Sequence, residues 1–324
     1  MMVFGPVPSR RLGRSLGINN IPPKNCTYSC IYCQLGHTKR MTSKRRQFYK
    51  PDDILKEVQE RITQVHTQGE KIDYFTLVPD GEPTLDVNLG KTIEKLKQFS
   101  AKIAVITNSS LIWQKEVREH LLQADWVSLK IDSVLETAWR KINRPQKLLS
   151  LDDILKGIQE FSHQFQGRLV TETMLVRDIN DDSESIQKTA EFMGKLSPSV
   201  CYISIPIRPP AENWVKQPRE KTLITAHQIY SEKVENTELL IGYEGNAFAS
   251  PGNIQKDLLS ITAVHPMRRD AVERILDKTN GTWSDVMQLI AKGILVETEH
   301  RGRLFYSRKL TQPMNKNPLG ARVE

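Results

Sequence analysis

Apolar positions along this chain follow two spacings in turn, which predict alternating strands and helices. Two-residue alternation and short apolar runs predict six strands, at residues 15–21, 72–78, 102–107, 126–131, 169–175 and 200–205. Three- and four-residue spacing predicts six helices between these strands, one opening at Pro51 and the others near residues 86–99, 113–123, 133–141, 151–165 and 182–196. Six strand–helix units are typical of a parallel sheet with helices outside, so we expect an α/β fold.

The pattern changes after about residue 250. It predicts a linker, two helices and a two-stranded hairpin, at residues 250–253, 268–278, 283–292 and 295–307. Thr282 opens the second helix, with Asp285 as its capping-box partner. Two helices followed by a hairpin predict a small winged-helix-like domain. We therefore divide the chain into an α/β domain, a winged-helix-like domain and a flexible tail, at residues 1–250, 251–311 and 312–324.

The composition is that of a globular protein, with 39% hydrophobic and 26% charged residues in a chain of 324. No apolar run reaches about 18 residues, so we expect no membrane-spanning helix. The first residues lack the apolar core of a signal peptide, which predicts a cytoplasmic protein. Three of the four cysteines lie within eight residues, a spacing that favours metal or redox chemistry over disulfides.

The net charge of +8 is concentrated near the N-terminus. The first 51 residues hold ten basic and no acidic residues, whereas the rest of the chain holds 36 basic and 38 acidic ones. Six of the ten form a run just after the cysteines, namely Lys39, Arg40, Lys44, Arg45, Arg46 and Lys50. We predict that this run rims the active site and binds a phosphate-bearing substrate. A solvated basic arm is the alternative.

Cys26, Cys30 and Cys33 form a C-x3-C-x2-C motif in a loop after the first predicted strand. Iron–sulfur clusters take thiolates from such compact loops and have four ligands in all. A zinc site also needs four ligands, and zinc with His37 as the fourth is the alternative. Three cysteines with one open position favour a cluster whose last iron binds a small molecule. Cys201, inside an apolar strand, is interpreted as a core residue.

At this motif the chain resembles the radical S-adenosylmethionine (SAM) superfamily, whose signature has an aromatic residue before the last cysteine, here Tyr32. The resemblance implies a partial (β/α)6 barrel, a [4Fe–4S] cluster held by the three cysteines, and SAM bound at the fourth iron. It implies reductive cleavage of SAM to a 5′-deoxyadenosyl radical that abstracts hydrogen from a substrate. It also implies an electron donor such as flavodoxin or ferredoxin.

The resemblance extends to the SAM contacts. Asp80, Gly81 and Glu82 resemble the family's Gly-Gly-Glu segment, which receives the amino group of SAM, with Asp80 in place of the first glycine. Residues at the ends of the next strands are implied for the ribose and carboxylate of SAM, because barrel enzymes place their active sites there, namely Asn108, Ser128, Lys130, Asp132 and Glu172. A turn and a polar barrel interior are the structural alternatives.

Further motifs resemble a branch related to the tRNA-wyosine synthases, although the second-cluster cysteines of those enzymes are missing from this sequence. They lie at residues 5–13, 34–36, 80–85 and 142–145. We therefore expect a radical SAM enzyme that modifies tRNA or another RNA. An activase or maturase acting on a protein, and a cluster-based redox regulator, stay open as alternatives. The second C-terminal helix has too few basic and amide side chains to favour sequence-specific DNA binding.

Overall fold

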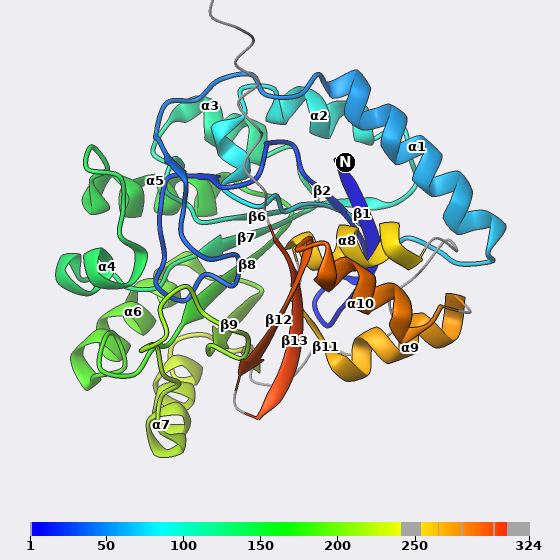
Figure 1. The fold of residues 1–324 in the computed structure, drawn as a ribbon. Helices are drawn as coiled ribbons and strands as arrows, with labels where there is room; N and C mark the ends of the chain where they lie inside the picture. Colours follow the sequence, from blue (N-terminus) through cyan, green and yellow to red (C-terminus); the bar gives the residue numbers. More distant parts are fainter. Residues whose placement is uncertain (1, 241–253, 265, 280, 301, 310–324) are drawn as a thin grey trace, which may run out of the picture.

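The computed structural model describes residues 2–240, 254–264, 266–279, 281–300 and 302–309. Its main feature is an eight-stranded sheet in the order β1-β2-β5-β6-β7-β8-β9-β10 (Figure 1). The strands are β1 (Val3–Ser9), β2 (Gly13–Ile18), β5 (Tyr74–Leu77), β6 (Lys102–Thr107), β7 (Trp126–Lys130), β8 (Arg168–Met174), β9 (Val200–Ser204) and β10 (Thr237–Leu240). From β2 to β10 neighbouring strands are parallel, and β1 pairs antiparallel with β2 at the edge.

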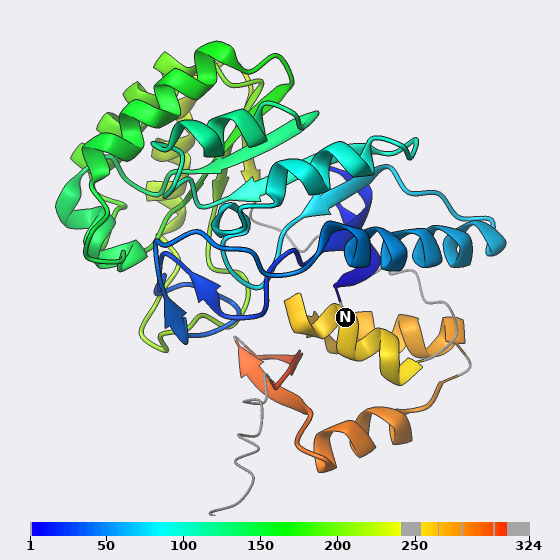
Figure 2. The same cartoon turned by 90° about the horizontal axis from the view of Figure 1, so that it is seen from above.

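Helices connect the parallel strands and cover the outer face of the sheet (Figure 2). They are α1 (Pro51–Thr67), α2 (Leu89–Leu96), α3 (Lys115–Leu121), α4 (Glu136–Asn143), α5 (Leu151–Gln164), α6 (Ser183–Leu196) and α7 (Glu220–Ser231), with a short 3-10 helix η1 (Pro83–Leu85) after β5. Side-chain caps fix two of their starts: Ser150 accepts from the Asp153 N–H, and Asp182 from the Ser185 N–H. No described helix is both long and apolar enough to cross a membrane.

Two-residue alternation sends side chains of each strand to opposite faces of the sheet. Val127 and Leu129 of β7 join the large core beneath the helices. Trp126 of the same strand instead joins a smaller cluster with Val170 of β8 and Tyr202 of β9. The side chains of this cluster come from neighbouring strands and share the inner face of the sheet. Both faces are buried, as in a parallel sheet covered by helices.

The predicted α/β fold with a parallel sheet is confirmed, but counting six strand–helix units missed β1, β10 and α7. β1 carries Pro6 and Pro8, which cannot donate to a strand ladder, and its register with β2 shifts between Phe4 and Val7. An edge strand tolerates both features, and they hide it from a pattern search. The first predicted strand, 15–21, ends at Ile18.

The turn between β1 and β2 closes one end of the sheet's interior. Leu12 is 3% exposed and lies in the inner cluster with Trp126 and Tyr202. The Arg11 guanidinium lies 5.9 Å from the Trp126 ring and 5.7 Å from the Tyr202 ring. Its Nη1 makes a 2.7 Å ion pair with Glu172 of β8. This turn therefore fixes the N-terminal hairpin to the middle of the sheet.

The C-terminal residues form a second unit with its own core. Its elements are α8 (Ile254–Val264), β11 (Met267–Arg268), α9 (Arg269–Thr279), α10 (Trp283–Ala291), β12 (Leu295–His300) and β13 (Arg303–Arg308). The strands pair in the order β11-β13-β12, and the capping box of Thr282 and Asp285 is present as predicted. The sequence pattern predicted two helices here, and α8 is a third. The winged-helix assignment stays a prediction, and the predicted linker and tail lie outside the described residues.

The C-terminal unit lies against the N-terminal strand (Figures 1 and 2). α8 contacts β1 as well as β13, and Val7 of β1 packs against the core of the C-terminal unit. The N-terminal hairpin therefore links this unit to the interior of the large sheet.

Arg11→Gln should lower the free energy of unfolding by about 3 kcal/mol, because it leaves the buried Glu172 carboxylate with one cation fewer. Urea unfolding followed by circular dichroism measures this change. Arg10→Gln is the matched control: Arg10 is exposed, so its replacement should cost about 0.5 kcal/mol or less. If both variants lower the free energy of unfolding by the same amount, the role assigned to Arg11 is contradicted.

Candidate active site

The three cysteines of the motif lie in a loop attached to the C-terminal end of α4. The backbone N–H groups of Ser29 and Ile31 donate to the carbonyl oxygens of Asn143 and Ile142, both at 3.0 Å. Carbonyls in the last turn of a helix have no partner within the helix, so they are free to anchor this loop. The Cys33 N–H donates to the Cys30 carbonyl at 3.1 Å, which folds the loop back on itself.

Two asparagine side chains donate to cysteine sulfurs. Asn108 Nδ2 lies 3.5 Å from Cys26 Sγ, and Asn143 Nδ2 lies 3.4 Å from Cys30 Sγ. Burial, together with the nearby Glu82 carboxylate, raises the pKa of the Cys26 thiol to about 12, so that a bound metal is needed to hold it as a thiolate at neutral pH. Hydrogen bonds to the sulfurs are one way in which proteins tune iron–sulfur clusters. The residues present fit such a cluster.

The arrangement of the sulfurs disfavours zinc. In the residues that the structure describes, no three histidine, cysteine, aspartate or glutamate side chains are placed to hold one metal ion. A structural zinc ion needs four ligands around a single centre, whereas in a four-iron cluster each cysteine binds a different iron. His37, the alternative fourth ligand, is exposed. The geometry therefore favours the cluster.

The segment Asp80-Gly81-Glu82 packs against the backbone just before Cys26. The Glu82 N–H donates to the Asn25 carbonyl oxygen at 3.1 Å. A Cβ at Gly81 would lie 1.9 Å from the same oxygen, so only glycine fits there. The segment and the cluster loop are thus in direct backbone contact.

Glu82 is fully engaged within the protein. Its Oε1 accepts from the Thr84 N–H at 3.1 Å, the Thr84 hydroxyl at 2.6 Å and the Thr107 hydroxyl at 2.6 Å. Its Oε2 accepts from the Asn108 N–H at 2.7 Å. Burial raises the pKa of Glu82, and these hydrogen bonds oppose that rise. This carboxylate joins η1 to the end of β6 and holds Asn108 beside Cys26.

Asp80 is in the opposite situation. It is 2% exposed, and neither of its carboxylate oxygens has a hydrogen-bond partner. Burial raises its pKa to about 7, against the effect of the Lys24 and Arg308 cations. An unsatisfied buried polar group costs about 1–3 kcal/mol. Asp80 therefore marks a place where a ligand can supply hydrogen-bond donors.

The register of β7 and β8 places Lys130 opposite Glu172. Lys130 Nζ lies 2.9 Å from Glu172 Oε1, and Ser204 Oγ donates to the same oxygen at 3.0 Å. Although burial opposes ionisation of Glu172, the Lys130 and Arg11 cations hold its pKa well below the usual range. Burial also opposes the charge on Lys130, but the Glu172 and Asp132 carboxylates raise its pKa. Lys130 is thus a protonated cation at neutral pH.

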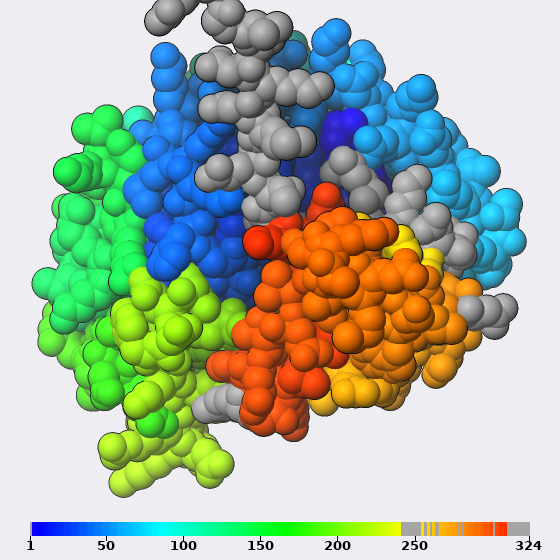
Figure 3. Space-filling view, in the orientation of Figure 1, coloured from blue at the N-terminus to red at the C-terminus, as the bar shows by residue number. Residues whose placement is uncertain are grey.

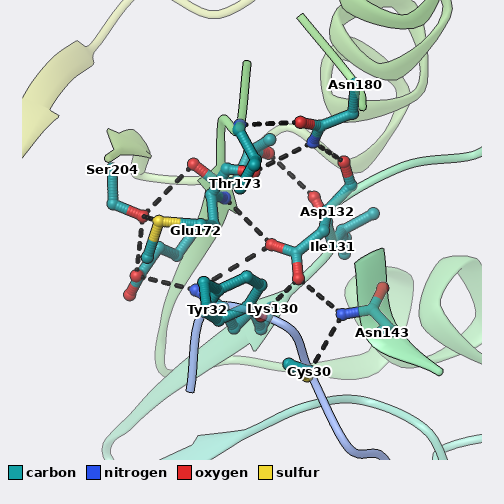
Figure 4. A network of polar contacts seen from close by, with 12 residues as sticks. Cys30, Tyr32, Lys130, Ile131, Asp132, Asn143, Glu172, Thr173, Asn180 and Ser204 are labelled. Carbon is teal, nitrogen blue, oxygen red and sulfur yellow. Dashed lines mark hydrogen bonds and ion pairs between the residues drawn. The ribbon is translucent and has the colours of Figure 1, made fainter. Parts of the chain in front are cut away.

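Asp132 connects this ion pair to the cluster loop (Figure 4). Its Oδ2 accepts hydrogen bonds from the Tyr32 hydroxyl and, at 2.6 Å, from Asn143 Nδ2. Its Oδ1 accepts from the Met174 N–H at 2.9 Å and lies 3.9 Å from Lys130 Nζ. One carboxylate thereby joins the cluster loop, α4, β7 and β8.

A cavity of about 350 Å³ lies between the cluster loop and the inner face of the sheet. This volume is in the range of small-molecule sites. The sequence-predicted site residues that line it are Tyr32, Cys33, Asp80, Lys130 and Glu172. Of the three cysteines only Cys33 lines it, since Cys26 and Cys30 lie outside the lining formed by the described residues. Five of the predicted SAM contacts lie outside it as well, namely Gly81, Glu82, Asn108, Ser128 and Asp132. Four of these five support the wall or the cysteines, while Ser128 is a buried hydroxyl on the inner face.

The basic run after the cysteines does not contribute to the lining of this cavity as far as the chain is described. The Arg45 side chain is 6% exposed, and its guanidinium contacts the Thr84 carbonyl at 2.9 Å and the Glu116 carboxylate at 3.0 Å. The Arg45 donors are thus used within the fold, and its predicted role as a substrate contact stays a prediction. The remaining five are exposed, and their predicted role stays a prediction, namely Lys39, Arg40, Lys44, Arg46 and Lys50.

Three residues of the site were missed by sequence reasoning, namely Arg11, Asn143 and Ser204. Arg11 was counted in the basic N-terminal segment and lay in the motif at residues 5–13, with no role of its own attached to it. Asn143 lay in a motif at residues 142–145 with no role attached to it. Ser204 is the last residue of an apolar strand, and nothing in the sequence around it indicated a role in the site. Each acquires its role through a contact with a residue more than ten positions away in the sequence.

Comparisons with known proteins agree with this geometry. The profile of the radical SAM superfamily matches residues 20–193. A UPF0026 protein of Methanocaldococcus jannaschii is 48% identical over 311 residues, which cover 95% of this chain and 96% of that protein. A radical SAM methyltransferase from Sphaerobacter thermophilus has a similar fold, with a TM-score of 0.52, 14% identity and coverage of 70% of this chain and 66% of that one. TYW1 with a bound lysine–pyruvate adduct gives a TM-score of 0.50, 15% identity and coverage of 68% and 74%.

Replacing Cys26, Cys30 or Cys33 with alanine should abolish cluster assembly, because a four-iron cluster with only two protein ligands is not held. Iron and sulfide analysis after anaerobic reconstitution should find about four of each per chain in the parent protein. Cys201→Ala is the control, since Cys201 is fully buried in β9, and it should keep the full content. Native protein that contains zinc and no sulfide would contradict the cluster.

Asp80→Asn should stabilise the cofactor-free protein at pH 8 but not at pH 4. The folded-state pKa of about 7 exceeds the unfolded value of 3.8, so the parent loses stability as pH rises from about 4 to 7 and levels off above that. The variant lacks this loss, so its free energy of unfolding at pH 8 should exceed that of the parent by on the order of 2 kcal/mol. Thermal unfolding of both proteins across this range is the measurement. If the difference in stability between the parent and the variant does not change with pH, Asp80 is not the buried, ionisable group described here.

Proposed function

This chain belongs to the radical SAM superfamily, and from that premise we propose that it is an RNA-modifying enzyme with tRNA as its substrate. Its cofactors are a [4Fe–4S] cluster and SAM. When bound, these groups supply the electron and the radical that start the reaction on the substrate. The protein's own part is to hold them, to orient the substrate and to exclude water.

The observation that carries the proposal is that Cys33 and the unsatisfied Asp80 face one cavity. Asp80 suits the ammonium group of SAM, because that cation supplies the donors its oxygens lack and favours its ionised form. Lys130 faces the same cavity as a cation and suits the carboxylate of SAM. Two side chains of opposite charge in one cavity match an amino acid group.

The far end of the cavity is closed. Leu12 and Arg11 line it there, and Leu12 packs with Trp126 and Tyr202 below them. A volume of about 350 Å³ is near the lower end of the range for small-molecule sites, so a substrate as large as an RNA would insert one group at most.

The C-terminal unit flanks the cavity. Val7 lines the cavity and also packs against the C-terminal core, and the Arg308 cation on β13 acts on Asp80. Figure 3 shows the N-terminal segment in blue, the residues after β9 with α7 in yellow-green and the C-terminal strands in red on one face. A macromolecule bound by the C-terminal strands would lie beside the cavity.

RNA is favoured over a protein substrate by charge and by motif resemblance. β13 and the residue after it carry Arg303, Arg308 and Lys309, and such cations suit phosphate rather than bases. The net charge of the whole chain, +8, is also positive and favours a polyanionic partner. The motifs at residues 5–13 and 142–145 resemble those of the tRNA-wyosine branch. Together these features support a polyanionic substrate bound by its backbone.

Arg303→Gln combined with Lys309→Gln should weaken tRNA binding and make it less dependent on salt. Each lost phosphate contact removes about 0.7 from the slope of log affinity against log salt for single strands, so we expect a change of about 1.4. Binding of tRNA at several salt concentrations is the measurement. Lys221→Gln with Lys233→Gln is the matched control, because both lysines are exposed on or after α7, and it should leave the slope unchanged.

The reaction itself is tested by incubating tRNA anaerobically with reduced, cluster-loaded protein and SAM. Mass spectrometry of the digested nucleosides should then show one new species, which the Cys33→Ala protein does not form. The substrate for this reaction is tRNA from cells that lack this protein. If none of its nucleosides is altered, and the slope of log tRNA affinity against log salt is the same in the Arg303/Lys309 variant as in the Lys221/Lys233 control, RNA is not the substrate.

A further inference from the structure

The basic run holds a short exposed strand directly opposite a cluster ligand. β4 (Arg40–Met41) pairs in parallel with β3 (Asn25–Cys26), and the register places Met41 opposite Cys26. The Thr42 N–H donates to the Cys26 carbonyl oxygen at 3.1 Å. Both residues of β4 are exposed, Met41 at 41%. The molecular surface at Met41 is therefore one hydrogen bond away from the backbone of a cysteine that holds the cluster.

A second exposed apolar side chain lies beside this strand. Gln146 Oε1 accepts from Ser43 Oγ at 3.5 Å and from the Leu148 N–H at 2.7 Å. Leu148 is 83% exposed, the highest value among the exposed large apolar side chains of the described residues. Met41 and Leu148 thus give this surface an apolar component.

Cations accompany these two side chains. Arg40, Lys44 and Lys147 are exposed, and none of them forms a salt bridge within the described part of the chain. The nearby carboxylates Glu116 and Glu212 are paired with Arg45 and Arg144 instead. We call the surface formed by Arg40, Met41, Lys44, Lys147 and Leu148 the Met41 patch.

We propose that the Met41 patch docks a small acidic protein that delivers one electron to the cluster. The proposal rests on the cluster assigned above. In this step the carrier is oxidised by one electron and the cluster is reduced by one, with no bond made or broken. Electron transfer falls steeply with distance, so a carrier must approach a ligand of the cluster, and the Met41 patch provides such an approach on the outer side of the loop.

Two properties of the patch fit this partner. Positive charge attracts an acidic carrier and speeds its encounter, and weak redox complexes use small interfaces. Its residues are absent from the lining of the cavity in the described chain, so a carrier docked there leaves the cavity free for SAM and substrate. An RNA bound there would gain nothing from the contact with Cys26, which is why the carrier is favoured.

The test compares two reductants on one variant, Arg40→Gln with Lys44→Gln and Lys147→Gln. Cluster reduction is followed anaerobically by the loss of its visible absorbance, first with reduced flavodoxin, an acidic flavin protein, and then with dithionite. With flavodoxin at low salt the variant should react at least tenfold more slowly than the parent, and its rate should depend less on salt. With dithionite, which needs no docking surface, the two rates should agree within twofold.

The matched control replaces three exposed lysines on or just after α1 and α2, namely Lys56, Lys91 and Lys97, and should behave as the parent with both reductants. An unchanged flavodoxin rate in the patch variant overturns the proposal, and so does an equal loss with dithionite. A variant that keeps the flavodoxin rate but loses tRNA binding would assign the patch to RNA. Since the readout is cluster reduction and not turnover, failure of the RNA proposal leaves this test intact.

Discussion

The ionised carboxylate of Glu172 is the interaction on which the site depends. It lies on the inner face of the parallel sheet and pairs there with Lys130 from the neighbouring strand and with Arg11 from the N-terminal turn. A buried charge of this kind is tolerated only when it is paired and hydrogen-bonded, and removing one partner is costly. The pairing therefore fixes the position of the turn that closes the cavity, and it also fixes the orientation of Lys130.

From Lys130 the network continues to Asp132 and on to the cluster loop. Tyr32 and Asn143 both donate to Asp132, and Asn143 also donates to the sulfur of Cys30. The cluster ligands are thus oriented by the same set of polar groups that shapes the cavity wall. Such supporting contacts are what hold metal ligands and their neighbours in a fixed geometry.

The sequence predicted the parallel α/β fold, because alternation along buried strands and spacing along helices are local signals. It also indicated Lys130 and Glu172 as neighbours in function, and the strand register places them opposite one another. It did not distinguish Asp80 from Glu82, because the difference lies in hydrogen bonds from Thr107 and Asn108, residues of another strand end. The internal contacts of Arg45 could not be predicted for a similar reason, since nothing near it in the sequence shows that Glu116 accepts a hydrogen bond from its guanidinium.

If the three cysteines and the cavity serve to cleave SAM, the protein must release 5′-deoxyadenosine, and this release is the most direct measurement. Anaerobically reconstituted protein, reduced with dithionite and given SAM alone, should release it slowly, while the Cys33→Ala protein should release none. If reduced protein with its full content of iron and sulfide yields no 5′-deoxyadenosine, with or without tRNA, the account of this site is wrong.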